Sequence, residues 1–238
     1  MSKKLLLEGK RVLLAEDEDF SRKVVSQMIE KLGCTELTLV GEGDSAAAAL
    51  KEAGPFDVAI LDFRMPNRNG LELLKDVRVG LGQVPREQRV MMLTASSDYE
   101  LLGAAMALDV DAFVTKPITL VQMAERIRGI FKQWGEYKTA SRYALVDIED
   151  VSRRLTASLP KVPSAAAEAE AAPRRGTLTK LENVRAGFFL SEDITGPQKQ
   201  LVLASGSRLS ERLIARLIEV KDVTKIKEIW VEPGEPED

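Results

Sequence analysis

Histidine is absent from the 238 residues of this sequence. Imidazole bases, histidine metal ligands and phosphohistidine intermediates are therefore excluded within it. The side chains available for catalysis or ligand binding are therefore carboxylates, lysine and hydroxyl groups. A phosphoryl group carried on histidine would have to come from another protein.

Cysteine and long apolar runs are also scarce. The single cysteine, Cys34, cannot form an intrachain disulfide. The opening run Met-Ser-Lys-Lys-Leu-Leu-Leu is too short for a signal peptide. No apolar stretch approaches the roughly 20 residues that span a bilayer. We therefore expect a cytoplasmic protein without a membrane partner.

The charge balance shows no basic excess. The net charge is −3 and the pI is near 5.4, which disfavours nucleic acid or an anionic membrane as the partner. A chain of 238 residues accommodates one α/β domain and a smaller unit.

The first half alternates short apolar runs with amphipathic stretches, which predicts an α/β fold with a five-stranded, doubly wound parallel sheet. The expected strands are 12–15, 36–40, 58–61, 90–93 and 112–115. Helical spacing predicts core-facing stripes between and after them. Their residues are Phe20, Val24, Val25, Met28 and Leu32, then Leu101, Leu102, Ala105 and Leu108, then Leu120, Met123, Ile127, Ile130 and Trp134.

The second half of the chain has three segments that differ in composition. We predict a helical extension over 134–159, where Ile148, Val151, Leu155 and Leu159 keep helical spacing. Residues 160–176 are rich in Ala, Glu and Pro and predict a flexible linker. Residues 177–233 predict a small α+β module with strands at 188–195, 200–204 and 226–231. Its helix begins after the N-cap Ser210.

Polar side chains follow the predicted strands. Glu16 and Asp17 follow the first, Asp62 the third, Thr94 the fourth and Lys116 the fifth. Ligands of open parallel sheets bind at this edge. Crowded carboxylates repel one another unless a cation is present, and oxygen ligands suit Mg²⁺. With the metal and Lys116 neutralising charge, Asp62 can act as a nucleophile toward a phosphoryl group, with the Thr94 hydroxyl donating to it.

The runs that contain these residues occur in a familiar order. They are Val-Leu-Leu-Ala-Glu-Asp, Ile-Leu-Asp-Phe-Arg-Met-Pro-Asn-Arg-Asn-Gly, Met-Met-Leu-Thr-Ala and Phe-Val-Thr-Lys-Pro-Ile. On these runs, residues 10–133 resemble the flavodoxin-like receiver domains of bacterial two-component response regulators.

The resemblance implies roles for individual residues. Asp62 would be the phosphoacceptor, and Glu16, Asp17, Asp62 and the backbone carbonyl of Arg64 would bind Mg²⁺. Thr94 and Lys116 would assist the transfer, Thr94 would also be the switch hydroxyl, and Phe113 the aromatic residue that swings inward with it. Lys116-Pro117 would be a cis peptide. A histidine kinase or phosphotransfer protein would supply the phosphoryl group to this phosphoprotein, whose only catalysis would be self-phosphorylation and autodephosphorylation.

Other readings remain open. Asp17-x-Asp19 suggests a haloacid-dehalogenase-like phosphohydrolase, but Phe20-Ser21 replaces the Gly-Thr of that family. The C-terminal module weakly resembles an accessory segment of HD-GYP cyclic-di-GMP phosphodiesterases, whose catalytic core needs histidine. A degenerate output of that kind and a DNA-binding output are the alternatives. We rank first an output through protein contacts or self-association, with a homodimer formed by a helix at about 147–159.

Overall fold

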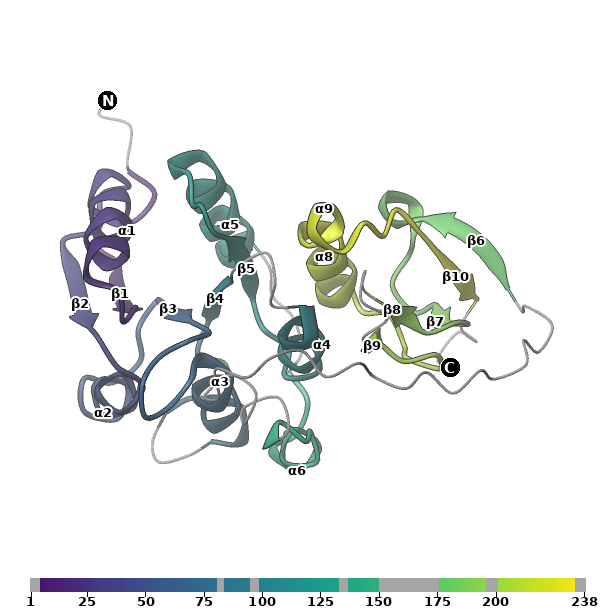
Figure 1. Cartoon of the computed structure of the whole chain (residues 1–238), viewed down its shortest axis with the longest axis horizontal. Coiled ribbons are helices and arrows are strands. Elements are labelled where there is room, and N and C mark those ends of the chain that lie inside the picture. The colour runs from purple at the N-terminus through teal and green to yellow at the C-terminus, as the bar shows by residue number, and fades with distance from the viewer. Residues whose placement is uncertain are drawn as a thin grey trace, which may run out of the picture.

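The computed structural model describes residues 5–80, 84–94, 99–132, 137–149, 176–195 and 201–233. Within these ranges, no helix is long and apolar enough to cross a membrane. The first two-thirds of the described chain forms an α/β domain, and the last two ranges form a smaller module beside it (Figure 1).

The α/β domain is built on the predicted parallel sheet. Its strands are β1 (Arg11–Ala15), β2 (Glu36–Val40), β3 (Val58–Asp62), β4 (Val90–Thr94) and β5 (Ala112–Thr115). The spatial order is β2-β1-β3-β4-β5, with every pair parallel. The predicted strands are confirmed to within one residue, because buried parallel strands are apolar on both faces and stand out in the sequence.

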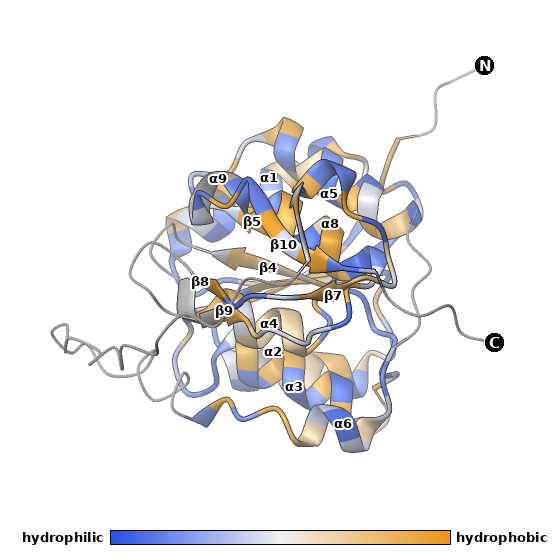
Figure 2. Cartoon of the chain, turned by 90° about the vertical axis from the view of Figure 1, so that its right-hand side faces the viewer, coloured by the Kyte–Doolittle hydropathy of each residue, from blue (hydrophilic) through white to orange (hydrophobic). Residues whose placement is uncertain are grey.

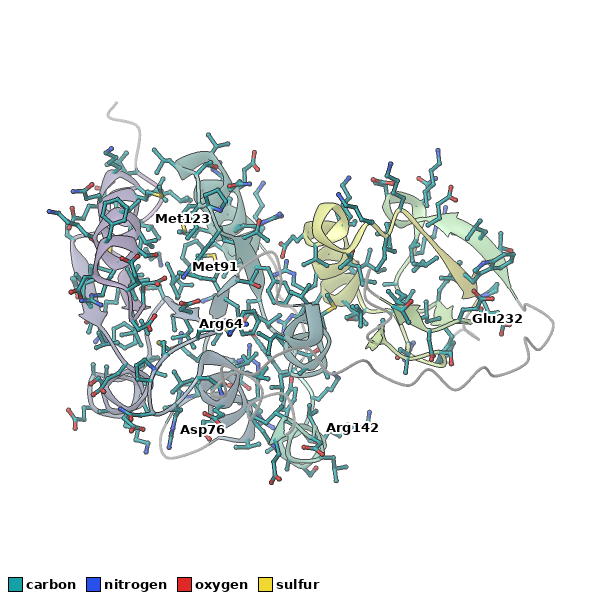
Figure 3. The ribbon with its side chains drawn as sticks, viewed as in Figure 1. Arg64, Asp76, Met91, Met123, Arg142 and Glu232 are labelled. Atoms are coloured by element: carbon teal, nitrogen blue, oxygen red, sulfur yellow. The ribbon has the colours of Figure 1, made fainter. Side chains whose placement is uncertain are left out.

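Five helices cover the two faces of the sheet. Helices α1 (Asp19–Lys31) and α5 (Leu120–Lys132) cover one face. Helices α2 (Gly43–Glu52), α3 (Gly70–Val79) and α4 (Tyr99–Ala107) cover the other. Each helix contributes buried apolar residues to one of the two core clusters, and Figure 2 shows the hydrophobic and hydrophilic stretches along these helices. On the first face, Met91 of β4 and Met123 of α5 belong to one core cluster (Figure 3).

Two residues of the predicted core-facing stripes are exposed: Phe20 of α1 and Leu120, which is the first residue of α5 and is 38% exposed. Phe20 is 73% exposed, whereas Val25 and Ile29 of the same helix are buried. The reason is position, because α1 begins at Asp19 and its first turn lies beyond the apolar strand segments. The stripe at Leu101, Leu102, Ala105 and Leu108 is confirmed as buried.

The segment after α5 folds back onto the domain. A short helix, α6 (Ala140–Ala144), lies against α3. The Tyr143 side chain is fully buried, and its hydroxyl donates to Asp109 Oδ2 at 2.8 Å. Lys75 Nζ donates to the Val146 carbonyl at 2.8 Å. Most of the predicted helix at about 147–159 and of the predicted linker over 160–176 lies outside the described residues, which end at 149 and resume at 176.

The C-terminal module contains two small antiparallel sheets. The first has the order β6-β10-β7, from β6 (Thr177–Lys180), β10 (Glu228–Glu232) and β7 (Phe189–Leu190). The second pairs β8 (Ile194–Thr195) with β9 (Leu201–Leu203). A 3-10 turn (Leu181–Asn183) and helices α8 (Glu211–Glu219) and α9 (Lys221–Thr224) complete the module.

The elements predicted for the C-terminal module are confirmed only in part. Ser210 caps α8 as predicted, its hydroxyl accepting from Leu213 N at 3.2 Å. Residues 188–195 are not one strand, because β7 and β8 join different sheets. Strand β6 was missed, since its residues alternate weakly and pair only with the distant β10. Strand β10 begins at Glu228 rather than 226.

The module packs against the edge of the α/β domain. Helix α8 contacts β5, the edge strand of the large sheet, and β9 contacts α4. One apolar cluster continues from the α2–α4 face into the module and contains residues of both, such as Leu102, Phe113, Val202 and Leu217. In Figure 1, α8 accordingly stands between β5 and the small sheets.

Candidate functional site

The predicted site residues gather at the carboxyl edge of the parallel sheet. Asp62 ends β3 and pairs in register with Leu93, so Thr94 lies one residue further along β4. Glu16 follows β1, and Lys116 follows β5, where its amide donates to the Thr94 carbonyl at 2.8 Å. Parallel strands carry all these termini to one edge.

Three carboxylates converge there. One oxygen each of Glu16, Asp17 and Asp62 lies within 4.8 Å of the others. Glu16 is fully buried, Asp62 is 5% exposed and Asp17 faces solvent. The cluster therefore has a buried wall and an open side.

Lys116 is the cation of this cluster. Its Nζ donates to Asp62 Oδ2 and to Glu16 Oε1, both at 2.9 Å. Burial acts to lower the pKa of Lys116, but the hydrogen bonds and attraction from Glu16 and Asp62 outweigh it, so the pKa is raised. Lys116 therefore stays an ammonium group at neutral pH.

One ammonium group does not balance the negative charge. Burial, followed by repulsion from Glu16, raises the pKa of Asp62 to about 7, against the opposing attraction of Lys116. Glu16 Oε2 lies 2.8 Å from Lys116 Nζ but is buried and accepts no hydrogen bond within the described residues. Three clustered carboxylates, of which Glu16 and Asp62 are buried, carry more negative charge than one ammonium group balances, and such a cluster fits a hard divalent cation such as Mg²⁺.

The loop that carries Glu16 and Asp17 is held by residues that the sequence analysis did not single out. Arg22 Nη1 donates to the Glu16 carbonyl at 2.7 Å and to the Asp17 carbonyl at 3.3 Å, and Arg22 also pairs with Asp19. Glu18 caps α1 by accepting from the amides of Phe20 and Ser21. The available signal was the acidic run Glu16-Asp17-Glu18-Asp19, whose third residue is the N-cap.

The loop after Asp62 is fixed by α2 and α3. Asn69 and Glu72 form a capping box at the start of α3. Asn67, in the left-handed region with φ of 66°, donates from Nδ2 to Glu42 Oε2 at 2.8 Å. Arg64 is exposed on this loop (Figure 3), and the metal-binding role of its carbonyl stays a prediction.

The two predicted switch residues lie on neighbouring strands, where Phe113 pairs in register with Met92, two residues before Thr94. Thr94 and Phe113 are 1% and 2% exposed. The Phe113 ring stacks on Phe63, the residue after Asp62, with 6.3 Å between ring centroids. The Lys116-Pro117 peptide is cis, as predicted.

The domain has a five-stranded parallel sheet in the order 2-1-3-4-5. An acidic cluster and a lysine lie at the carboxyl edge of this sheet. These features together define a receiver-type domain. The sequence profile of the response regulator receiver domain matches residues 12–128. That segment is a response regulator receiver domain of the two-component signalling class.

This chain is also similar, over about half of its length, to curated chemotaxis proteins and to solved response regulator structures. Chemotaxis protein CheY-3 of Vibrio cholerae is 28% identical over 131 residues, which are 54% of this chain and 97% of the relative. Chemotaxis protein CheY of Pseudomonas aeruginosa is 29% identical over 52% of this chain and 97% of its own length. A putative response regulator from Chloroflexus aurantiacus is 21% identical, with a TM-score of 0.48 over 52% of this chain and 98% of its own.

Proposed function

We propose that this protein is a response regulator that accepts a phosphoryl group on Asp62. The observation that carries the proposal is the buried carboxylate of Asp62, hydrogen-bonded to Lys116 and adjoining Glu16 and Asp17 at the carboxyl edge of the sheet. The donor is a phosphohistidine of a histidine kinase or phosphotransfer protein, since this chain contains no histidine.

The transfer forms one bond and breaks one bond. An Asp62 carboxylate oxygen attacks phosphorus, the phosphorus–nitrogen bond of the donor breaks, and its electron pair returns to the imidazole nitrogen, which is then protonated. Lys116, already 2.9 Å from Asp62 Oδ2, pairs with the transferred group. The Thr94 hydroxyl donates to one of its oxygens.

Glu16, Asp17, Asp62 and the Arg64 carbonyl would hold Mg²⁺ in this proposal. When bound, Mg²⁺ supplies positive charge that neutralises the phosphoryl oxygens and the clustered carboxylates. Glu16 contributes a fully buried carboxylate to this set. Arg22 holds the backbone on which Glu16 and Asp17 stand.

The test is incubation with Mg²⁺ and acetyl phosphate, followed by intact mass measurement. The wild type should gain one phosphoryl group, and Asp62→Asn should gain none. Asp57→Asn, at the opposite end of β3, is the matched control and should be phosphorylated like the wild type. Equal labelling of wild type and Asp62→Asn would place the phosphoryl group elsewhere and overturn the proposal.

We propose that the output runs through protein contacts rather than through DNA. The arginines of α8, Arg212 and Arg216, are 8% and 2% exposed, so they are buried against the rest of the chain rather than presented to phosphates. Weak, salt-insensitive retention on heparin and on random duplex DNA is expected. Strong retention that falls steeply with salt would favour the DNA-binding alternative.

A further inference from the structure

Helix α8 packs against β5, the edge strand of the receiver sheet, and the buried carboxylate of Glu219 joins the two elements. Glu219 Oε2 accepts a hydrogen bond from the Phe113 amide of β5 at 3.1 Å. Its Oε1 lies 3.4 Å from Arg126 Nη1 on α5 and 2.9 Å from Arg216 Nη2 on α8. The Glu219 side chain is 8% exposed. The amide at the switch position is thus held by a residue of the C-terminal module.

A second contact lies at the other end of α8. The Arg212 guanidinium stacks on the Tyr137 ring, 3.9 Å from its centroid, and Arg78 lies over the same ring at 4.6 Å. Tyr137 donates to Asp111 Oδ1 at 2.8 Å, and Arg212 Nη2 lies 3.6 Å from the same oxygen. Burial, then the Asp111 charge, raises the pKa of Tyr137 to about 12, so its hydroxyl stays a donor.

The docked helix also leaves little space outside β5. A cavity of about 10 Å³ remains between β5, α5 and α8, lined by Phe113, Gln122, Arg126 and Glu219 among others. That volume holds about one water molecule. That space is too small for the Phe113 ring, which instead packs on Phe63, the residue that follows Asp62.

We propose that docking of the C-terminal module and phosphorylation of Asp62 favour each other. Helix α8 caps β5 and confines Phe113 to its buried position beside Phe63. This inference rests on the proposed function and on the predicted switch, in which Phe113 swings inward together with Thr94 once Asp62 is phosphorylated. Both events then stabilise the same arrangement of β5, so the module is a cooperative partner of the phosphorylated receiver rather than an inhibitor that phosphorylation releases.

Linkage makes this coupling reciprocal. If docking raises the affinity of the site for a phosphoryl group, phosphorylation strengthens docking by the same factor. The contact between α8 and the receiver is not fully satisfied, because Arg212 Nε and Nη1 are buried without a hydrogen-bond partner in the described residues. Such groups reduce the net strength of docking. An event at Asp62 can therefore shift how far the module is docked.

The test uses the full chain with docking loosened from each side. Arg126→Met removes the receiver's ion pair with Glu219, and Arg212→Met removes the stacking on Tyr137 and the pairing with Asp111. The matched controls are Arg128→Met, exposed on the same helix α5, and Arg185→Met, exposed in the module. The probe is beryllofluoride with Mg²⁺, which mimics the phosphoryl group, titrated by amide NMR.

Two readouts separate docking from phosphorylation. Hydrogen exchange of the Phe113 amide, measured without beryllofluoride, reports docking alone. We expect it to accelerate in both loosened variants and to stay unchanged in both controls. The beryllofluoride midpoint reports coupling, and we expect it to weaken about fivefold or more in the loosened variants only.

Each other outcome counts against the proposal. Accelerated exchange with unchanged or tighter beryllofluoride binding would mean that the module opposes the phosphorylated state or ignores it. Unchanged exchange in both loosened variants would mean that Arg126 and Arg212 do not hold α8 on β5. A wild type that binds no beryllofluoride would overturn the proposed function and the coupling with it, while Phe113 exchange still reports docking.

Discussion

At the scale of single residues, charge pairing sets both the site and its surroundings. Lys116 is shared by Glu16 and Asp62, and a further cation is needed to balance the cluster. At the opposite end of the sheet, Asp57 has cations and donors in excess. Lys10 Nζ donates to it at 2.8 Å and the Arg11 amide at 2.9 Å. The pKa of Asp62 is therefore raised above that of an ordinary aspartate, whereas the pKa of Asp57 is lowered.

Mg²⁺ should stabilise the folded protein through the acidic cluster. At a concentration ten times its dissociation constant, we expect about 1.4 kcal/mol of added stability, or roughly 3–5 °C in Tm for a chain of this size. Glu16→Gln should lose most of this shift because it removes a buried ligand. Glu125→Gln, exposed on α5, is the control and should keep it. Thermal unfolding with and without EDTA gives the measurement, and an equal shift in both variants would argue against the site.

Acid should remove the contribution of the Lys10–Asp57 pair. Burial acts to raise the pKa of Asp57, but the hydrogen bonds from Lys10 and the Arg11 amide outweigh it and hold that pKa below its ordinary 3.8. A lowered folded-state pKa contributes stability above pH 3.8 that is lost as the pH falls through the folded value.

The variant Lys10→Met tests this dependence. Because Lys10 is 40% exposed, we expect a loss below about 1 kcal/mol at pH 6, and a smaller difference from the wild type below pH 3.8. Lys23→Met, exposed on α1, is the control and should show no such dependence. Urea unfolding between pH 2.5 and 7 gives the values. A difference that grows toward low pH would contradict the assignment.

At the scale of elements, the close approach of α2 fixes the loop that follows Asp62. The start of α2 lies so near this loop that a Cβ on Gly43 would meet the Arg68 carbonyl oxygen at 1.7 Å. Asn67 and Glu42 join the same two segments by a hydrogen bond. The β3–α3 loop is therefore positioned by α2 as well as by its own capping box.

Two glycine substitutions should have opposite effects. Gly43→Ala forces backbone segments apart and should destabilise the protein by about 1–3 kcal/mol. Gly129 lies within α5 with nothing within 4 Å of an added Cβ, so Gly129→Ala should stabilise by roughly 0.5–1 kcal/mol. Denaturant unfolding measures both. Equal effects of the same sign would show that the approach of α2 to the loop is not tight.

At the scale of the whole molecule, the receiver and the module share an interface that is both apolar and charged. The apolar cluster runs without a break from the α2–α4 face into the module. Around it lie the Glu219 contact with Phe113 and the Arg212 contact with Tyr137. The face formed by α4, β5 and α5 is thus occupied by this chain's own C-terminal module.

A shared core predicts joint unfolding. Calorimetry of the wild type should show one transition, with the van't Hoff enthalpy equal to the calorimetric enthalpy. Arg212→Met should weaken the coupling and broaden or split that transition, whereas Arg185→Met should not. Two resolved transitions in the wild type would mean that the module unfolds independently of the receiver.

The sequence by itself determined the receiver fold and the members of its candidate site. Parallel strands buried on both faces are continuous apolar runs, and the residues that follow them must share one edge, so Asp62, Thr94 and Lys116 were found without coordinates. Their chemical roles stay predictions. The exposure of Phe20 was missed because periodicity does not show where the core ends.

Only the tertiary structure decided where the C-terminal module lies. Strand β6 pairs with β10 across about fifty residues, and Glu219 meets Phe113 across 106 positions. Arg212, Arg216 and Glu219 look like solvated charges in the sequence. They are buried because their partners, Tyr137, Asp111 and the Phe113 amide, come from another part of the fold. Such contacts depend on packing between segments, which no local pattern records.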